Sequence, residues 1–288
     1  MEWNRMTLFT AETYLAFIGL GFIVGAYGTL IGAGGGFVLM PLLLLLYPDE
    51  TPEKITAISL AIVFLNALSG SQAYARMRRI DYKSGLLFAS ATIPGAILGA
   101  LNTRMVPREL FDSIFAVFLM AGAAFLALRP ELAPMGKDEP QNHHSITMSR
   151  HIKEGNGTTH DYSFNPLVGV FISLFVGYIS SFLGIGGGII HVPALVYLLH
   201  FPVHVATATS HFILVIMALT GTIVHIETGS FAGGVHHMIS LAIGVVLGAQ
   251  LGAHLSNYLK GKWIIRSLAI ALGMVGVRII ISVIQRGV

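Results

Sequence analysis

The chain has 288 residues, of which 54% are hydrophobic and 11% are Asp, Glu, Lys or Arg, and its mean hydropathy is +0.75. Soluble domains carry about 25% charged residues, so this chain cannot cover soluble cores of its size with polar surface. The composition predicts an integral membrane protein. The absence of Cys excludes disulfides and thiolate sites. We attribute the net charge of +3 to basic residues at the ends of apolar runs and expect no nucleic-acid partner.

Ten apolar segments appear when the chain is divided at its charges and at its Gly and Pro clusters. A spanning helix needs about 20 mostly apolar residues, and the second and seventh segments are too short to span comfortably. We expect the first segment to be a retained span, because a similar segment recurs inside the chain. In order, the segments are Tyr14–Ile31, Phe37–Tyr47, Ile55–Tyr74, Leu86–Leu101, Phe111–Leu128, Leu167–Leu183, Ile189–Leu199, Val205–Ile226, Met238–Leu255 and Trp263–Ile284.

One long polar stretch separates the fifth segment from the sixth. Residues 129–165 contain several Pro and His and lack apolar periodicity, which predicts a flexible connector. We therefore expect a first transmembrane repeat over 1–128, a polar, His-containing cytoplasmic linker over 129–165 and a second transmembrane repeat over 166–288. Metal binding by the linker histidines, which include the pair His143 and His144, stays open as an alternative.

An internal repeat supports this division. The residues from Leu30 to Pro41 (LIGAGGGFVLMP) align without gaps with those from Phe182 to Pro193 (FLGIGGGIIHVP). Later matches follow with small changes of register, so the chain is one five-segment unit written twice. An odd number of crossings per unit inserts the second copy upside down.

The charges of the loops favour inverted copies. The loop after the third segment is basic whereas its equivalent after the eighth has no Lys or Arg, and the basic loop after the ninth segment has an equivalent balanced by acidic residues. Inverted copies predict this exchange. We expect an all-α integral membrane fold of about ten transmembrane segments in two inverted five-segment repeats, with both termini periplasmic; re-entrant second and seventh segments remain an alternative. The basic residues are Arg76, Arg78, Arg79, Lys83, Lys260, Lys262 and Arg266.

Each copy contains a glycine cluster that breaks its helix. Glycine density and the following Pro41 or Pro193 prevent a continuous helix, and the downstream piece then begins with free backbone N–H groups and a positive dipole end. Two such ends meeting near the midplane predict an anion site. Close helix packing is the alternative, and it is our interpretation of the later pairs Gly95 with Gly99 and Gly248 with Gly252. The clusters are Gly32, Gly34, Gly35, Gly36, Gly184, Gly186, Gly187 and Gly188.

The two copies of Gly-x-Gly-Gly-Gly-x-x-x-x-Pro, separated by a polar linker in an apolar chain, resemble the sulfite and organosulfonate exporter family TauE/SafE. The resemblance covers nearly the whole chain except the linker. It implies a secondary transporter of the bacterial inner membrane that moves sulfite, thiosulfate or organosulfonates. The residues by themselves support only an anion site. No phosphate-binding loop with a following Lys-Ser or Lys-Thr is present, so the sequence does not support transport driven by ATP.

Polar side chains inside the apolar segments are the other candidates, since such groups are costly in a membrane. Hydroxyl and amide groups can bind a sulfonate without placing a charge there, and an imidazole can carry a proton. The alternative for each hydroxyl is a hydrogen bond to a backbone carbonyl of its own helix. The candidates are Ser59, Asn66, Ser69, Ser71, Thr207, Ser210, His211, Thr220, Thr222, His191, Gln250 and His254.

We expect a gradient-driven exporter of small sulfur-containing anions, with a proton or sodium as coupling ion and the lipid bilayer as its surroundings. We expect no cofactor and no enzymatic activity, and a homodimer stays open. The main alternative is a metal-cation transporter or channel that uses histidines. A membrane metalloenzyme built on His200 and His204 is disfavoured because Phe201 and Pro202 intervene and carboxylates are scarce.

Overall fold

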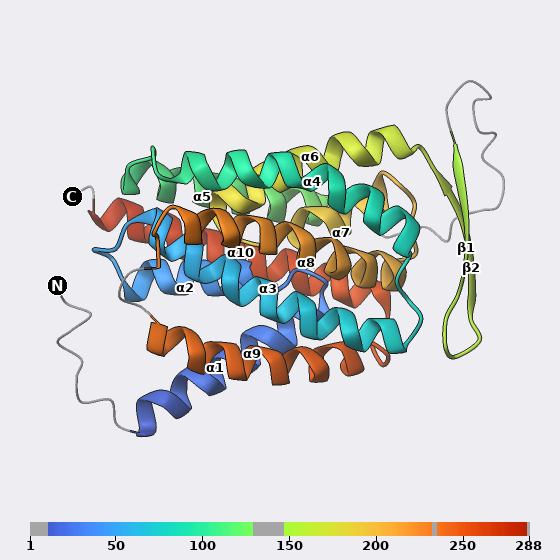
Figure 1. Ribbon diagram of the computed structural model, residues 1–288, viewed down its shortest axis with the longest axis horizontal. Helices are drawn as coiled ribbons and strands as arrows, with labels where there is room; N and C mark the ends of the chain where they lie inside the picture. The colour runs from blue at the N-terminus through green and yellow to red at the C-terminus, as the bar shows by residue number, and fades with distance from the viewer. Residues whose placement is uncertain (1–10, 129–146, 232–234, 287–288) are drawn as a thin grey trace.

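A computed structural model describes residues 11–128, 147–231 and 235–286. In this part the chain forms ten helices and one two-stranded hairpin (Figure 1). All ten predicted segments are helical. The first half holds α1 (Ala11–Leu30), α2 (Gly36–Leu46), α3 (Pro52–Arg76), α4 (Tyr82–Thr103) and α5 (Arg108–Leu128). After β1 (Met148–Lys153) and β2 (Thr159–Phe164), the second half holds α6 (Pro166–Leu183), α7 (Gly188–Tyr197), α8 (Val203–Glu227), α9 (Val235–Leu255) and α10 (Gly261–Arg286).

Local capping residues set several helix starts. Thr51 caps α3 by accepting a hydrogen bond from the backbone N–H of Lys54, and Asn165 caps α6 in the same way through Leu167. Each cap is followed by Pro at the first helical position, where a missing N–H costs nothing. Polar caps therefore mark where the chain enters these apolar helices.

Two long helix pairs pack closely across the halves, α1 against α9 and α4 against α6. A side chain on Gly248 would collide with the backbone of Phe22 in α1, and one on Gly99 would collide with that of Tyr178 in α6. Because glycine removes the Cβ at these positions, the backbones can approach closely. The interpretation of the two later glycine pairs as packing residues is therefore confirmed.

Two pairs of equivalent helices, α3 with α8 and α5 with α10, run in opposite directions. In the contact of α3 with α8, Leu60 faces Gly221 and Gly70 faces His211, so residue numbers rise along one helix as they fall along the other. In the same way, residues 119–123 of α5 face residues 273–276 of α10 in reverse order. The two halves thus interlock around antiparallel α3–α8 and α5–α10 pairs.

The short helices α2 and α7 turn back from the centre of the molecule. Gly35 lies against Asn66 near the middle of α3, whereas Met40 lies towards Thr56 near its beginning, so α2 runs opposite to α3. α1 runs parallel to α3, since Tyr74 near the end of α3 donates a hydrogen bond to the carbonyl of Thr29 at the end of α1. α1 and α2 therefore form a helical hairpin whose tip is the first glycine break, and α6 and α7 form its counterpart.

Membrane-spanning capacity differs among the helices. Six of the described helices are long and apolar enough to cross a membrane, namely α1, α3, α4, α6, α8 and α9. α2 and α7 have 11 and 10 residues, and at 1.5 Å per residue they reach about 16 Å, half of a hydrocarbon core of about 30 Å. The mostly helical structure fits an all-α membrane protein, but the prediction of about ten full crossings is not confirmed.

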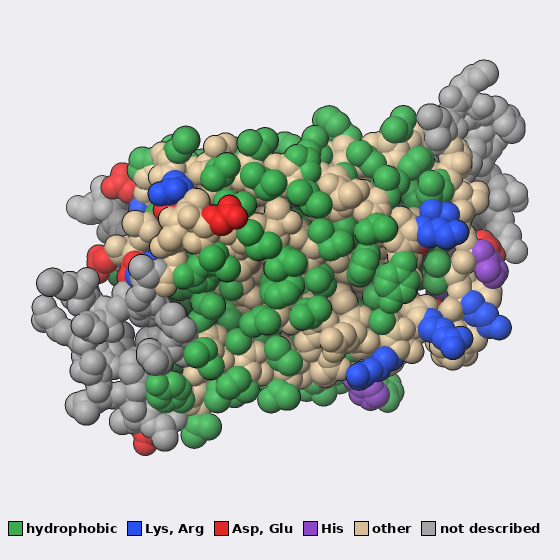
Figure 2. Space-filling model, viewed as in Figure 1, with side chains coloured by type: hydrophobic (Ala, Val, Ile, Leu, Met, Phe, Trp, Pro, Cys, Tyr) green, Lys and Arg blue, Asp and Glu red, His purple; other side chains and the backbone are tan. Residues whose placement is uncertain are grey.

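The surface has an apolar belt between two charged ends (Figure 2). Basic side chains gather at the end that carries the β-hairpin, and acidic side chains appear mainly at the other end. The exposed residues at the hairpin end include Arg76, Arg78, Lys83, Lys153 and Lys260, and those at the opposite end include Asp49, Glu109 and Glu227.

The linker departs from its prediction. Residues 148–164 form an antiparallel hairpin in which Met148 pairs with Phe164, so the expectation of a flexible connector is wrong there, and the fold is not purely helical. Tyr162 packs against Phe201 at a ring-centroid distance of 4.5 Å and donates a 2.9 Å hydrogen bond to Asp81. Burial and the Asp81 carboxylate raise the pKa of Tyr162, so its hydroxyl remains a donor. His143 and His144 lie outside the described residues.

Candidate functional site

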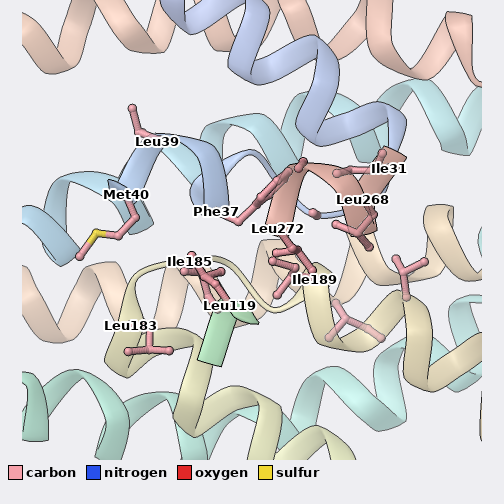
Figure 3. Packing of buried hydrophobic residues seen from close by; sticks show 14 of the residues in the cluster. Ile31, Phe37, Leu39, Met40, Leu119, Leu183, Ile185, Ile189, Leu268 and Leu272 are labelled. Atoms are coloured by element: carbon pink, nitrogen blue, oxygen red, sulfur yellow. The ribbon is translucent and has the colours of Figure 1, made fainter. Parts of the chain in front are cut away.

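The two glycine breaks touch each other at the centre of the molecule. A side chain on Gly188 would collide with the carbonyl of Gly32, and the Cβ position of Gly36 lies 2.5 Å from the carbonyl oxygen of Ile185. Gly34 and Gly36 of the first break and Gly186 of the second pack on Val63, the twelfth of 25 residues in α3. Buried apolar side chains from several helices surround this contact, as Figure 3 shows. The glycines on Val63 therefore lie about halfway along α3, whereas Gly32 and Gly184 lie against Thr207 and Thr56 near the starts of α8 and α3.

Left-handed backbone explains much of the glycine content. The φ angles are +79°, +74° and +77° at Gly32, Gly34 and Gly35, and +67° and +72° at Gly184 and Gly186. Side chains are strained in this region, whereas glycine adopts it freely. Gly36, Gly187 and Gly188 do not have positive φ, and Gly36 and Gly188 serve instead to let the backbones approach.

The half-helices α2 and α7 begin at this contact. The first backbone hydrogen bonds of α2 run to the carbonyl of Gly35, and those of α7 run to the carbonyl of Gly187. The N–H groups at Gly36 and Gly188 lie ahead of these bonds and belong to the orphan donors of a helix start. Two positive dipole ends thus meet at mid-depth, an arrangement that favours an anion.

Two serines join each break to the opposite half. The hydroxyl of Ser59 in α3 donates to the carbonyl of Gly184 at 2.5 Å, and the hydroxyl of Ser210 in α8 donates to the carbonyl of Gly32 at 3.2 Å. The two residues are equivalents in the repeat, and each donates its hydrogen bond to the break of the other half rather than to its own helix. Thr56 and Thr207, also equivalents, touch Gly184 and Gly32.

A polar network lies beside the first break. Thr29 donates a hydrogen bond to Oδ1 of Asn66 at 2.5 Å and lies 3.2 Å from Nε2 of His211, which fits a His211 tautomer that donates from Nε2. Asn66 donates from Nδ2 to the carbonyl of Gly25, and Tyr74 donates to that of Thr29. All four polar side chains are buried. The sequence singled out Asn66 and His211, whereas Thr29 and Tyr74 carried no signal beyond their position in apolar segments.

The second break has a sparser polar lining. Nε2 of His191 in α7 lies 3.2 Å from the hydroxyl oxygen of Ser173 in α6. Its Nδ1 has no partner among the described residues and lies 3.1 Å from the Cβ position of Gly187. The buried hydroxyls of Ser180 and Ser181 likewise lack a partner in the described part of the chain.

Other predicted site residues lie apart from the breaks. Ser69 donates to the carbonyl of Val246 in α9, and Gln250 donates to the hydroxyl of Ser69 at 2.9 Å, so these two join α3 to α9. Thr220 and Thr222 donate hydrogen bonds to carbonyls of their own helix, and Thr207 does the same although it also lies against Gly32. Ser71 is buried and its hydroxyl has no hydrogen-bond partner among the described residues, and His254 is exposed near the end of α9.

The histidines considered as metal ligands in the alternative hypothesis do not cluster where the structure describes them. In residues 11–128, 147–231 and 235–286, no group of three or more His, Asp or Glu could hold a metal ion. His151 pairs with Asp161 at 2.6 Å, and His160 pairs with Glu154 at 2.8 Å. The linker pair His143 and His144 lies outside these residues.

Comparisons with known proteins identify the family. The family model described as sulfite exporter TauE/SafE matches residues 17–279. The probable membrane transporter protein YunE of Bacillus subtilis is 32% identical over 276 residues, which cover 93% of this chain and 97% of that protein. A probable membrane transporter protein of Methanocaldococcus jannaschii is 24% identical, with 89% of this chain and 91% of that protein covered. No solved structure matches the chain.

These relatives are membrane transporters rather than enzymes, and the apolar helices agree with a multi-pass protein of the cell membrane. The match to the family model spans both glycine breaks and all ten helices except their outermost residues. The chain belongs to the TauE/SafE sulfite exporter family of membrane transporters.

Proposed function

We propose that the chain is a gradient-driven secondary transporter that exports small sulfur-containing anions such as sulfite, thiosulfate or organosulfonates. One observation carries the anion specificity: the positive ends of the half-helices α2 and α7 meet in the buried centre of the molecule. The polar side chains described around this contact are hydroxyl, amide and imidazole groups rather than carboxylates. The preference for sulfur rests on the family.

The substrate in this proposal binds first to the backbone of the two breaks. Ser59, Ser210 and Thr29 then orient its oxygens, and His211 provides an imidazole that a coupling proton could occupy. Sodium is the other coupling ion in the proposal, and a homodimer stays open as its assembly. The full set is Gly32, Gly34, Gly35, Gly36, Gly184, Gly186, Gly187, Gly188, Ser59, Asn66, Ser69, His191, Ser210, His211, Thr220 and Gln250.

The proposed topology has two inverted halves. In each half, the short second helix of a hairpin, α2 or α7, returns towards the side from which the hairpin came, and three further helices, α3–α5 or α8–α10, cross. The antiparallel α3–α8 and α5–α10 pairs support inversion, because an odd number of crossings reverses the second copy. The basic end then faces the cytoplasm together with the linker, and both termini face the periplasm of a bacterial inner membrane.

The test is a flux assay with the purified chain in liposomes. Labelled sulfite, thiosulfate and a small sulfonate are offered under imposed proton and sodium gradients, with Zn²⁺ as a cation in parallel. We expect at least one of the sulfur anions to cross faster than in empty vesicles and to respond to one gradient. Anion flux equal to that of empty vesicles, or flux of Zn²⁺ alone, would overturn the proposal.

A further inference from the structure

A polar cavity of about 390 Å³ opens at the basic end of the molecule, away from the glycine breaks. It lies between the end of α3, the turn of the β-hairpin and the end of α9. Its lining includes Arg76, Arg79, Glu154, Asn156 and Asn257. Two guanidinium groups and two amides with one carboxylate give it a donor-rich, net positive lining, which suits a small anion.

Arg79 and Glu154 are the buried pair of this cavity. Arg79 is 5% exposed, its Nε donates to Oε2 of Glu154 at 2.7 Å, and its Nη1 lies 3.3 Å from the hydroxyl of Ser256. Nε2 of His160 lies 2.8 Å from Oε1 of the same carboxylate. Both oxygens of Glu154 are therefore held by groups that bind oxyanions in general.

The charge state of Glu154 agrees with this geometry. Burial raises the pKa of the carboxyl, but the hydrogen bonds and charges of Arg79 and His160 outweigh it, so the pKa lies below its ordinary value. The carboxylate is thus ionised at neutral pH. It comes from the hairpin, whose turn is fixed to the end of α3 by a 2.9 Å bond from the N–H of Gly155 to the carbonyl of Met77.

The cavity is linked to the first glycine break through one residue. The backbone N–H of Arg79 donates to the carbonyl of Tyr74 at 3.3 Å, and the hydroxyl of Tyr74 donates to the carbonyl of Thr29 at 2.8 Å. Thr29 belongs to the polar network with Asn66 and His211. A ligand bound at Arg79 would therefore lie at the outer end of a chain of hydrogen bonds that ends beside the break.

We propose that this cavity is the cytoplasmic docking site for the small oxyanion that the chain transports, where Arg79 binds the oxyanion and the Glu154 carboxylate takes its place when the site is empty. The inference rests on the proposed anion transport. Glu154 acts as a tethered competitor, so the incoming anion must displace it and release the hairpin turn. The cavity is a second site, separate from the glycine breaks.

The first test is thiosulfate binding to the detergent-purified full chain, measured by calorimetry. Glu154→Gln removes the competing charge and keeps the shape, so we expect it to bind thiosulfate roughly tenfold more tightly than the unmodified chain. Adding Arg79→Gln should abolish that gain. Asp161→Asn and Arg78→Gln are the matched controls, because both are exposed charges of the same hairpin or loop, and they should leave the affinity unchanged.

The second test is sidedness in vesicles. Glu154→Gln should lower the KM for thiosulfate offered at the linker face and leave the KM at the opposite face unchanged. Unchanged affinity in Glu154→Gln, or a gain that survives Arg79→Gln, would overturn the docking site. If the unmodified chain carries no anion while the Arg79-dependent gain is present, transport fails and the binding site stands. Flux without that gain leaves transport standing and removes the site.

Discussion

The two glycine breaks are alike in backbone and unlike in side chains. Ser59 and Ser210 make the same hydrogen bond to opposite breaks. Beside the first break, however, Asn66 and His211 form a hydrogen-bonded network, whereas their repeat equivalents Met217 and Leu60 are apolar. The equivalent of Thr29 is Ser181, whose hydroxyl has no partner among the described residues.

This difference separates two tasks within one duplicated unit. The shared backbone contacts place two helix starts at the centre, which requires glycine in both copies. The unshared side chains give one side of the centre more hydrogen-bonding capacity than the other. In the proposed transport, a coupling proton would therefore bind on the side that carries His211.

The largest effect is expected where the two breaks touch. Gly188→Ala places a methyl group against the carbonyl of Gly32, and the backbone cannot yield. We expect loss of flux and destabilisation by about 3 kcal/mol, measured as flux and as the melting temperature in detergent. Gly19→Ala is the control, since nothing lies within 4 Å of its Cβ position, and it should keep flux. A Gly188→Ala protein with normal flux and melting temperature would refute the contact.

The next effect tests the asymmetry itself. Asn66→Met gives the first break the side chain that the second has, and it removes the partner of Thr29. We expect at least about a tenfold loss of anion flux, since hydrogen bonds to charged groups are worth about 1.5–3 kcal/mol. Met217→Leu conserves an apolar side chain at the equivalent position and should change flux little. Equal losses in both variants would show that the polar network has no special role.

A smaller effect tests the similarity of the breaks. Ser59→Ala and Ser210→Ala each remove one hydrogen bond to a break carbonyl, at a cost of about 1 kcal/mol. Ser59 has the shorter bond, 2.5 Å against 3.2 Å, so its replacement should lower the melting temperature more. The reverse order would contradict the geometry of the two bonds.

The smallest effect concerns the hairpin, which is linked to Thr29 beside the first break by hydrogen bonds through Arg79 and Tyr74. The pKa of Glu154 is depressed in the folded state. Its ion pair with Arg79 therefore stabilises the contact of the hairpin with the end of α3 at pH values above the ordinary pKa of 4.5. That contribution is lost as the pH falls through the depressed pKa. Hydrogen exchange of β1 and β2 should therefore accelerate below that pH, and Glu154→Gln should remove the acid-dependent part. Exchange that is independent of pH in the unmodified chain, after correction for intrinsic rates, would contradict this.

Much of the fold could be predicted because a bilayer constrains sequence strongly. Every backbone polar group must be satisfied inside the hydrocarbon layer, so long apolar runs are helices, and all ten predicted segments are helical. Glycine clusters marked the breaks for a similar reason, since Gly32 and Gly184 adopt φ angles that other residues avoid.

The hairpin was missed because its strands are short and polar. Asn156-Gly157 between alternating residues is a recognised turn signal, and it was present in the sequence. The contacts of Thr29 and Tyr74 could not be predicted, because they depend on how α1 packs against α3. The return of α2 and α7 towards their own side follows from the tertiary contact of the breaks, and short length alone left this open.

The central claim is that the anion lies between the starts of α2 and α7. The most direct measurement is an electron cryomicroscopy map of the chain in lipid nanodiscs with saturating thiosulfate. The account predicts thiosulfate density within hydrogen-bonding distance of the backbone N–H groups at Gly36 and Gly188, next to Ser59 and Ser210. Thiosulfate density only at another place, with the breaks packed as in the structure without ligand, would contradict it.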